Sequence, residues 1–313
     1  MPPTLLNWTK GLITLTIVII SFYFFYQYRE DFYLISQVNS ILFVTLSLLS
    51  ILSIIINGNK LRIITQSFNI KLKLNEWVGL SFISSSLNGV VYKSGSLITS
   101  NYLKRQHNFP YTSFVGSLGA DHLIMILINA SIAFGISIYS ITLSVKTLAL
   151  APVFLGMIIT ILYLVKSPSR FAKSENRFFK AFLQTAKILN NILQNKLLFR
   201  KLILNNLFLF IVMGLRFYFA CKAIGINIDI LYCYIFTTVS AFVRLAPMLQ
   251  SDIGSRELVV GFLSQSFGSG FKQGVLATAV DRVFEMIWAL IGMAFFKNLL
   301  ISTTLNTSEE NFN

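Results

Sequence analysis

Long apolar runs separated by short polar segments dominate this chain. A bilayer-spanning helix needs about 20 mainly apolar residues, and an isolated strand in lipid would leave its backbone groups unsatisfied. The pattern therefore predicts an all-α integral membrane protein, a polytopic helical bundle of about eight spans within one membrane domain over residues 1–313. The apolar runs lie at residues 11–28, 38–57, 76–92, 110–137, 147–165, 201–221, 228–247 and 274–303.

Two segments of mixed polarity follow apolar runs and do not fit the simple pattern. They are residues 93–107, after the run 76–92, and residues 248–270, after the run 228–247. Each is too polar for a span and too apolar for a solvated loop, and glycines interrupt both. Irregular backbone at membrane depth is tolerated where it is buried in protein or lines a water-filled cavity. We therefore expect two re-entrant or broken helices.

The two mixed segments also suggest an internal repeat. When residues 38–137 are set against residues 201–303, Asp121 of the first half falls on Asp281 of the second. A mixed, glycine-containing segment precedes each aspartate at a matching place. Repeats with broken helices at corresponding positions are the best sequence indicator of a transporter's binding site. The sequence thus predicts two related halves joined by a connector.

Composition and charge agree with a membrane protein. Hydrophobic residues make up 55% of the chain, charged residues 12%, and the mean hydropathy is +0.69. Because a soluble domain carries about 25% charged residues, the composition excludes an ordinary soluble domain. The net charge of +14 lies mainly in segments between apolar runs, which is typical of cytoplasmic loops rather than of nucleic-acid binding. We expect a protein of the plasma (inner) membrane of a bacterium and no nucleic-acid partner.

The strongest basic segment, residues 166–201, is the connector between the halves. The positive-inside rule places it in the cytoplasm. It is either an amphipathic helix on the inner leaflet or a solvated basic loop. A second basic segment, residues 60–73, should face the same side. Both can do so only if residues 76–107 enter and leave the membrane on one side.

Charged residues inside the last apolar run are the main functional candidates. Asp281 and Glu285 are four residues apart and share a helix face, and Arg282 is within reach of Glu285. Arg256 and Glu257 lie in the mixed segment upstream. Ionisable groups at membrane depth need partners or a polar cavity. Two interpretations stay open: ion pairs that fasten helices together, or a lipid-headgroup site in which Arg256 and Arg282 bind a phosphate in bidentate fashion.

Further candidates flank this cluster. Gly254 could leave backbone N–H groups free to bind an anion, and Arg244 is either a third cation or a snorkelling side chain. The carboxylates would orient the arginines or bind an amine. Arg216 and Lys222 are predicted to lie at the membrane interface, since they flank the end of a span.

The counterpart in the first half consists of Lys93, Gly95, Asp121 and His122. It is poorer in charge, because no carboxylate matches Glu257 and a methionine stands where the second half has Glu285. A hydrogen-bonded structural role is favoured for His122 over a metal ligand or a proton relay, since no second ligand has suitable spacing.

Catalytic and cofactor motifs are not found in the sequence. There is no nucleophile elbow, phosphate-binding glycine loop or zinc pattern, and the two cysteines form no disulfide framework. We predict no metal, no cofactor and no catalysis by this chain alone.

The second-half motifs resemble those of the lysylphosphatidylglycerol synthase transmembrane-region family, also called the flippase-like domain family. The first half resembles it through Gly95, Tyr102-Leu103 and Asp121, but Ser96 and His122 depart from its pattern. The resemblance spans about residues 38 to 300. The residues of the second half that carry it are Pro247, Gly254, Arg256, Glu257, Asp281, Arg282 and Glu285.

The resemblance implies a helical bundle that binds or translocates a phospholipid or a polyprenyl-phosphate-linked headgroup. Some family members carry a cytosolic aminoacyl-transferase domain, which we do not expect here because the chain reaches Asn313 soon after its last apolar run. Membrane lipids are therefore the expected partners. Two alternatives are an accessory subunit that positions a glycosyltransferase or aminoacyl-transferase partner, and a transporter of a small soluble anion.

Overall fold

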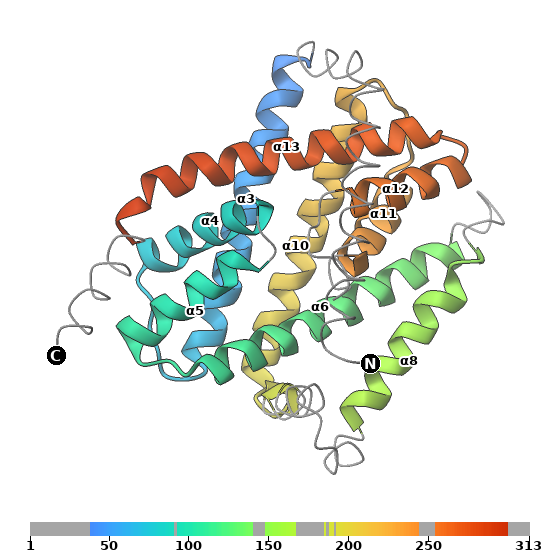
Figure 1. Cartoon of the computed structure of the whole chain (residues 1–313). Coiled ribbons are helices and arrows are strands. Elements are labelled where there is room, and N and C mark those ends of the chain that lie inside the picture. The colour runs from blue at the N-terminus through green and yellow to red at the C-terminus, as the bar shows by residue number, and fades with distance from the viewer. Residues whose placement is uncertain are drawn as a thin grey trace, which may run out of the picture.

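The computed structural model describes residues 38–90, 93–139, 148–166, 185, 188–190, 192–243 and 254–299. This part of the chain is helical apart from short turns and connections, without a strand (Figure 1). The predicted all-α class is confirmed. The helices are α3 (Ser40–Gln66), α4 (Leu74–Val90), α5 (Ser94–His107), α6 (Tyr111–Tyr139), α8 (Ala151–Lys166), α10 (Lys196–Ala223), α11 (Ile230–Val243), α12 (Ser255–Ser266) and α13 (Phe271–Phe295).

Three of the described helices are long and apolar enough to cross a membrane. These are α3, α6 and α10, with mean hydropathies of 2.3, 1.8 and 1.8 over their best windows. Apolar side chains such as Ile41 and Phe208 remain exposed on them, as expected of surfaces that face lipid. The number of about eight spans stays a prediction, and the apolar run 11–28 lies outside the described residues.

The mixed segments form short helices. α5 has 14 residues and α12 has 12. At 1.5 Å per residue they are about 20 Å long, less than the hydrocarbon core of about 30 Å. These lengths are compatible with the predicted re-entrant segments, although re-entry itself stays a prediction. The part of the second segment before Gly254 lies outside the described residues.

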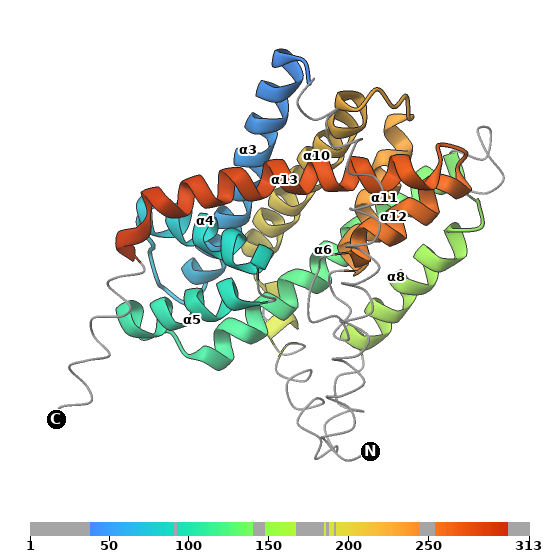
Figure 2. The same ribbon diagram turned by 45° about the horizontal axis from the view of Figure 1, so that its top comes forward.

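The helices pack in two matching sets. α3 packs along α10, and α13 crosses both of them, as Figure 2 shows. α4 contacts α3, α5 and α13, whereas α11 contacts α10, α12 and α6. We match α3, α4, α5 and α6 with α10, α11, α12 and α13, in that order. The helices that contact α4 are then the counterparts of the helices that contact α11. The contacts of the two sets thus correspond, and the internal repeat itself stays a prediction.

In each half a glycine lies very close to the backbone of a neighbouring helix. A Cβ atom on Gly95 of α5 would overlap the backbone of Ser84 on α4. In the second half, a Cβ atom on Gly274 of α13 would lie 2.7 Å from the carbonyl oxygen of Val260 on α12. Close backbone approach is a common use of glycine between membrane helices. The role of Gly95 is therefore in helix packing.

The end of the basic connector packs against the bundle. Leu189 and Ile192 are buried in one cluster with Ile63 and Ile64 of α3, so these side chains contact protein rather than lipid. The helix α10 begins at Lys196, inside the predicted connector. Most of residues 166–195 lie outside the described residues, and their cytoplasmic location stays a prediction.

A polar cluster fastens the open end of the α4–α5 hairpin. The Glu76 carboxylate, near the start of α4, accepts hydrogen bonds from the Tyr102 hydroxyl at 2.8 Å and from the Lys73 amide at 2.6 Å. The same carboxylate lies 3.1 Å from His107 Nε2. These contacts hold the last part of α5 against the start of α4. At the beginning of α5, Gly95 packs against the backbone of α4.

Replacing Glu76 by alanine should loosen this hairpin. The Tyr102 hydroxyl is part-buried, and leaving a buried partner unsatisfied costs about 1–3 kcal/mol. We expect Glu76→Ala to lower the thermal unfolding temperature of the purified protein in detergent. The exposed neighbour Asn75→Ala is the control. Equal unfolding temperatures for the two variants would show that the cluster does not stabilise the fold.

Candidate functional site

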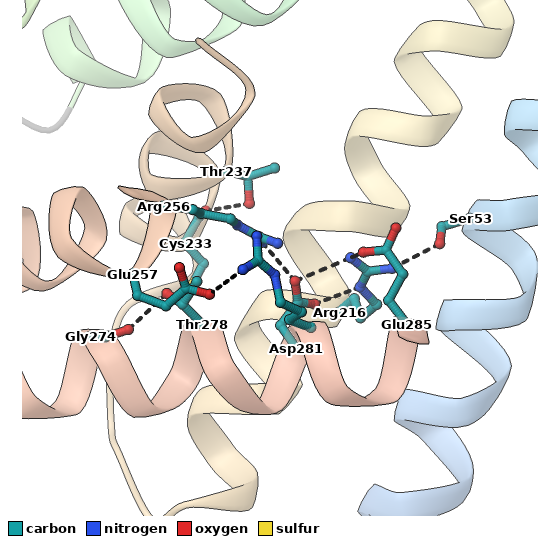
Figure 3. A network of polar contacts seen from close by, with 11 residues as sticks. Ser53, Arg216, Cys233, Thr237, Arg256, Glu257, Gly274, Thr278, Asp281 and Glu285 are labelled. Carbon is teal, nitrogen blue, oxygen red and sulfur yellow. Dashed lines mark hydrogen bonds and ion pairs between the residues drawn. The ribbon is translucent and has the colours of Figure 1, made fainter. Parts of the chain in front are cut away.

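A buried carboxylate, Asp281 on α13, is the centre of an ion-pair network (Figure 3). Arg216 of α10 binds it with two donors, Nε at 2.5 Å from Oδ1 and Nη2 at 3.1 Å from Oδ2. Arg256 of α12 donates to Oδ2 at 2.6 Å through its Nη2. Asp281 is only 1% exposed. One carboxylate of α13 thus joins this helix to both α10 and α12.

Arg216 extends the network to a fourth helix. Its Nη2 donates to Glu285 Oε2 at 2.7 Å, one turn further along α13. Its Nη1 donates to Ser53 Oγ of α3 at 2.8 Å. Arg216 is 1% exposed, and nearly all its donors are therefore matched to protein acceptors. A guanidinium suits this position because its donors form a rigid planar fork.

Arg282 and Glu257 form the second arm of the network. Arg282 Nη1 lies 2.9 Å from Glu257 Oε1, and Glu257 Oε2 accepts the Gly254 amide at 2.8 Å. Glu257 was not among the expected partners of Arg282, and the expected pairing of Arg282 with Glu285 stays a prediction. Adjacent residues on a helix point about 100° apart. Asp281 therefore reaches both α10 and α12, whereas Arg282 meets a different side chain of α12, that of Glu257.

The first half carries a related but smaller cluster. Asp121 of α6 is 2% exposed. Its Oδ2 accepts a hydrogen bond from Lys60 Nζ of α3 at 2.9 Å, and its Oδ1 accepts one from Asn206 Nδ2 of α10 at 2.9 Å. His122 donates from Nδ1 to the Leu118 carbonyl at 2.6 Å. This is a hydrogen bond along its own helix, in line with the structural role that the sequence favoured.

The two clusters occupy equivalent places in the helices. Asp121 comes ten residues after Tyr111, where α6 begins, and Asp281 comes ten residues after Phe271, where α13 begins. Their partners match as well, since Lys60 follows the start of α3 by twenty residues and Arg216 follows the start of α10 by twenty. Each half therefore has the same buried pair of a cation on one long helix and an aspartate on another.

Sequence reasoning missed the two cations of these pairs. Arg216 was expected at the membrane interface, but it is buried at the centre of the network. Lys60 was counted with a basic loop, because the apolar run ends at residue 57, whereas α3 continues to Gln66. For Arg216 a signal was available. It lies within the apolar run 201–221 and needed a partner for the same reason as Asp281.

Several residues that were predicted to belong to the site make other contacts or lie elsewhere. Lys93 is exposed at the α4–α5 turn, and the amide of Gly95 donates to Asn88 Oδ1 within the hairpin. The amide of Gly254 is bound by Glu257 and is not available to an anion. Arg244 lies outside the described residues. Within the described residues, no group of three metal-ligating side chains is close enough to bind a metal ion.

A cavity of about 340 Å³ connects the two clusters. From the first half, Lys60, Asp121 and His122 line it. The second half contributes three arginines and a carboxylate to the wall, namely Arg216, Arg256, Arg282 and Glu285. Asp281 and Glu257 are not in the wall and support the arginines from behind. Most of the predicted second-half residues are thus in or directly behind the wall of one polar cavity.

Removing Arg216 should destabilise the protein strongly. Breaking a buried ion pair leaves an uncompensated charge and costs about 3–5 kcal/mol. We expect Arg216→Gln to lower the unfolding temperature and the amount of protein in the membrane. Lys201→Gln, an exposed change on the same helix, should leave both unchanged. If Arg216→Gln behaved like this control, the network would not stabilise the bundle.

Comparison with known proteins extends the resemblance noted in the motifs. No curated relative and no solved structure matches the chain. The family model described as lysylphosphatidylglycerol synthase TM region matches residues 11–292, nearly the whole chain. Together with the apolar helices, this match identifies a membrane-integral protein. The chain belongs to the lysylphosphatidylglycerol synthase TM region family.

Proposed function

We propose that this protein binds the phosphate-containing headgroup of a membrane lipid in the cavity between its two halves, as a step in moving that lipid across the membrane. The observation that carries the proposal is the charge of the cavity wall. Four cationic side chains line it, against the two carboxylates Asp121 and Glu285. A cavity of this kind inside an apolar bundle suits an anionic group that enters from the lipid phase.

The arginines are held ready for such a group. Asp281 fixes Arg216 and Arg256, and Glu257 fixes Arg282, so the guanidinium planes are oriented before a ligand arrives. Within the described residues, Nε of Arg256 has no hydrogen-bond partner although the residue is 2% exposed. Arg256 thus retains a donor for a phosphate oxygen, and charge-assisted hydrogen bonds of this kind are the stronger ones.

The carboxylates limit the charge that the site can accept. The three arginines of the second half face three carboxylates, Glu257, Asp281 and Glu285. A phosphate must therefore compete with, or bridge, existing ion pairs. Glu285 is the most exposed of the paired acidic side chains, at 24%, and it is the acceptor we assign to a headgroup amine or hydroxyl.

Substituting lysine for the cavity arginines tests the phosphate contact. We expect Arg256→Lys and Arg282→Lys to stay in the membrane but to bind a fluorescent anionic phospholipid about tenfold more weakly. An ammonium does not reproduce the planar two-bond grip, and one hydrogen bond to a charged group contributes about 1.5–3 kcal/mol. Titration of the purified protein in detergent measures the affinity. Lys222→Arg, on an exposed contact of α10, is the control.

A charge swap separates lipid binding from helix fastening. In the double variant Arg282→Glu with Glu257→Arg the ion pair is kept but its direction is reversed. If the pair only fastens α12 to α13, the double variant should recover both membrane abundance and activity. We expect recovery of abundance alone, with lipid binding and the transfer of labelled lipid between the leaflets of proteoliposomes still lost.

A further inference from the structure

We propose that the first half of the bundle recognises hydroxyl groups, so that the preferred lipid carries a polyol or sugar next to its phosphate. This inference rests on the proposed function and names the class of its substrate. In this arrangement the arginines of the second half bind the phosphate. The opposite wall of the cavity binds the neutral remainder of the headgroup.

Five short neutral polar side chains line the first-half part of the cavity, beside apolar ones and the Lys60–Asp121 pair. The helix α4 supplies Ser84, Ser85 and Asn88, and spacings of three and four residues place them on one face. Asn57 of α3 and Ser96 of α5 complete this part of the wall. All five are half-buried. Such side chains on membrane helices are costly unless they contact a polar partner, and each of them lines the same cavity.

Two deeper hydroxyls have no partner. Thr99 Oγ1 and Ser117 Oγ lack a hydrogen bond to any described residue, although the two residues are 4% and 1% exposed and line the cavity. Buried polar groups are nearly always hydrogen-bonded. A hydroxyl both donates and accepts, so a ligand hydroxyl can satisfy either of them.

Hydrogen bonding within the helix does not explain these two residues. Serine and threonine in helices often donate to the carbonyl four residues earlier, and Ser137 and Thr278 do so here at 2.7 and 2.8 Å. Thr99 and Ser117 make no such bond. Of the described buried hydroxyls that lack a partner, Thr99 and Ser117 line the cavity, whereas Ser47, Ser50, Ser240 and Ser264 do not.

The charges of the first half do not compete for the ligand. Lys60 and Asp121 are bound to each other, and Asn206 binds the second oxygen of Asp121. The polar part of this wall therefore presents mainly neutral donors and acceptors. A headgroup rich in hydroxyls matches such a wall, whereas a headgroup without hydroxyls leaves its buried polar atoms unpaired. A site built for hydroxyls discriminates strongly against analogues that lack them.

Two lipids of equal charge and equal acyl chains test the inference. Phosphatidylinositol carries a polyol, and phosphatidylmethanol has the same phosphodiester without hydroxyls. We expect the purified full chain in detergent to bind phosphatidylinositol about tenfold more tightly, a difference of about 1.4 kcal/mol. Thr99→Val and Ser117→Ala should reduce this preference without weakening the binding of phosphatidylmethanol.

Two further variants serve as controls. Ser264→Ala removes a buried hydroxyl that also lacks a partner but does not line the cavity, and it should keep the full preference. Thr99→Ser keeps the hydroxyl and should retain the preference even if Thr99→Val fails to fold. Loss of preference in Ser264→Ala as well would contradict a specific role for the cavity hydroxyls.

The outcomes distinguish this inference from the proposed function. Equal binding of the two lipids overturns the hydroxyl preference and leaves the phosphate site intact. Binding of neither lipid overturns the proposed function and this inference with it. Competition with excess inositol phosphate distinguishes a lipid ligand from a soluble polyol phosphate. If it fails to displace the lipid, the ligand is the lipid itself, whereas full displacement would assign the site to a soluble polyol phosphate and contradict the lipid assignment.

Discussion

Burial of the Asp281 carboxylate is the constraint on which the second half of this bundle depends. A charge taken out of water in a membrane protein must be compensated by opposite charge and by hydrogen bonds. Here the compensation comes from Arg216 and Arg256, on helices that contact α13 from different directions. The carboxylate therefore fixes how α10, α12 and α13 meet. It also fixes which side of each arginine faces the cavity.

The apolar pattern predicted the helical class because a membrane admits few alternatives, but it could not place helix ends near charged residues. The run that ends at residue 57 hid the continuation of α3 to Gln66, and Lys60 was assigned to a loop for this reason. A long lysine side chain can bury its stem in a helix while its ammonium binds a partner. Hydropathy alone does not reveal that partner.

The candidate site was predicted better than its contacts. Arg256, Glu257, Asp281, Arg282 and Glu285 do form one network, since ionisable groups inside apolar runs had to find partners. The choice of partners was not predictable from spacing along one helix. Arg282 binds Glu257 on α12, a partner outside its own helix. Pairing across helices depends on the tertiary arrangement, which is also why the central role of Arg216 was missed.

The equivalent clusters differ in chemistry, and this difference makes the two halves mechanically unequal. In the second half a guanidinium grips Asp281 with two donors and reaches Glu285 and Ser53 as well. In the first half an ammonium makes a single contact with Asp121, supported by the neutral amide of Asn206. A point charge constrains direction less than a planar fork. Separating Lys60 from Asp121 therefore breaks fewer hydrogen bonds than separating Arg216 from Asp281 and Glu285, and the first-half pair restrains its two helices less.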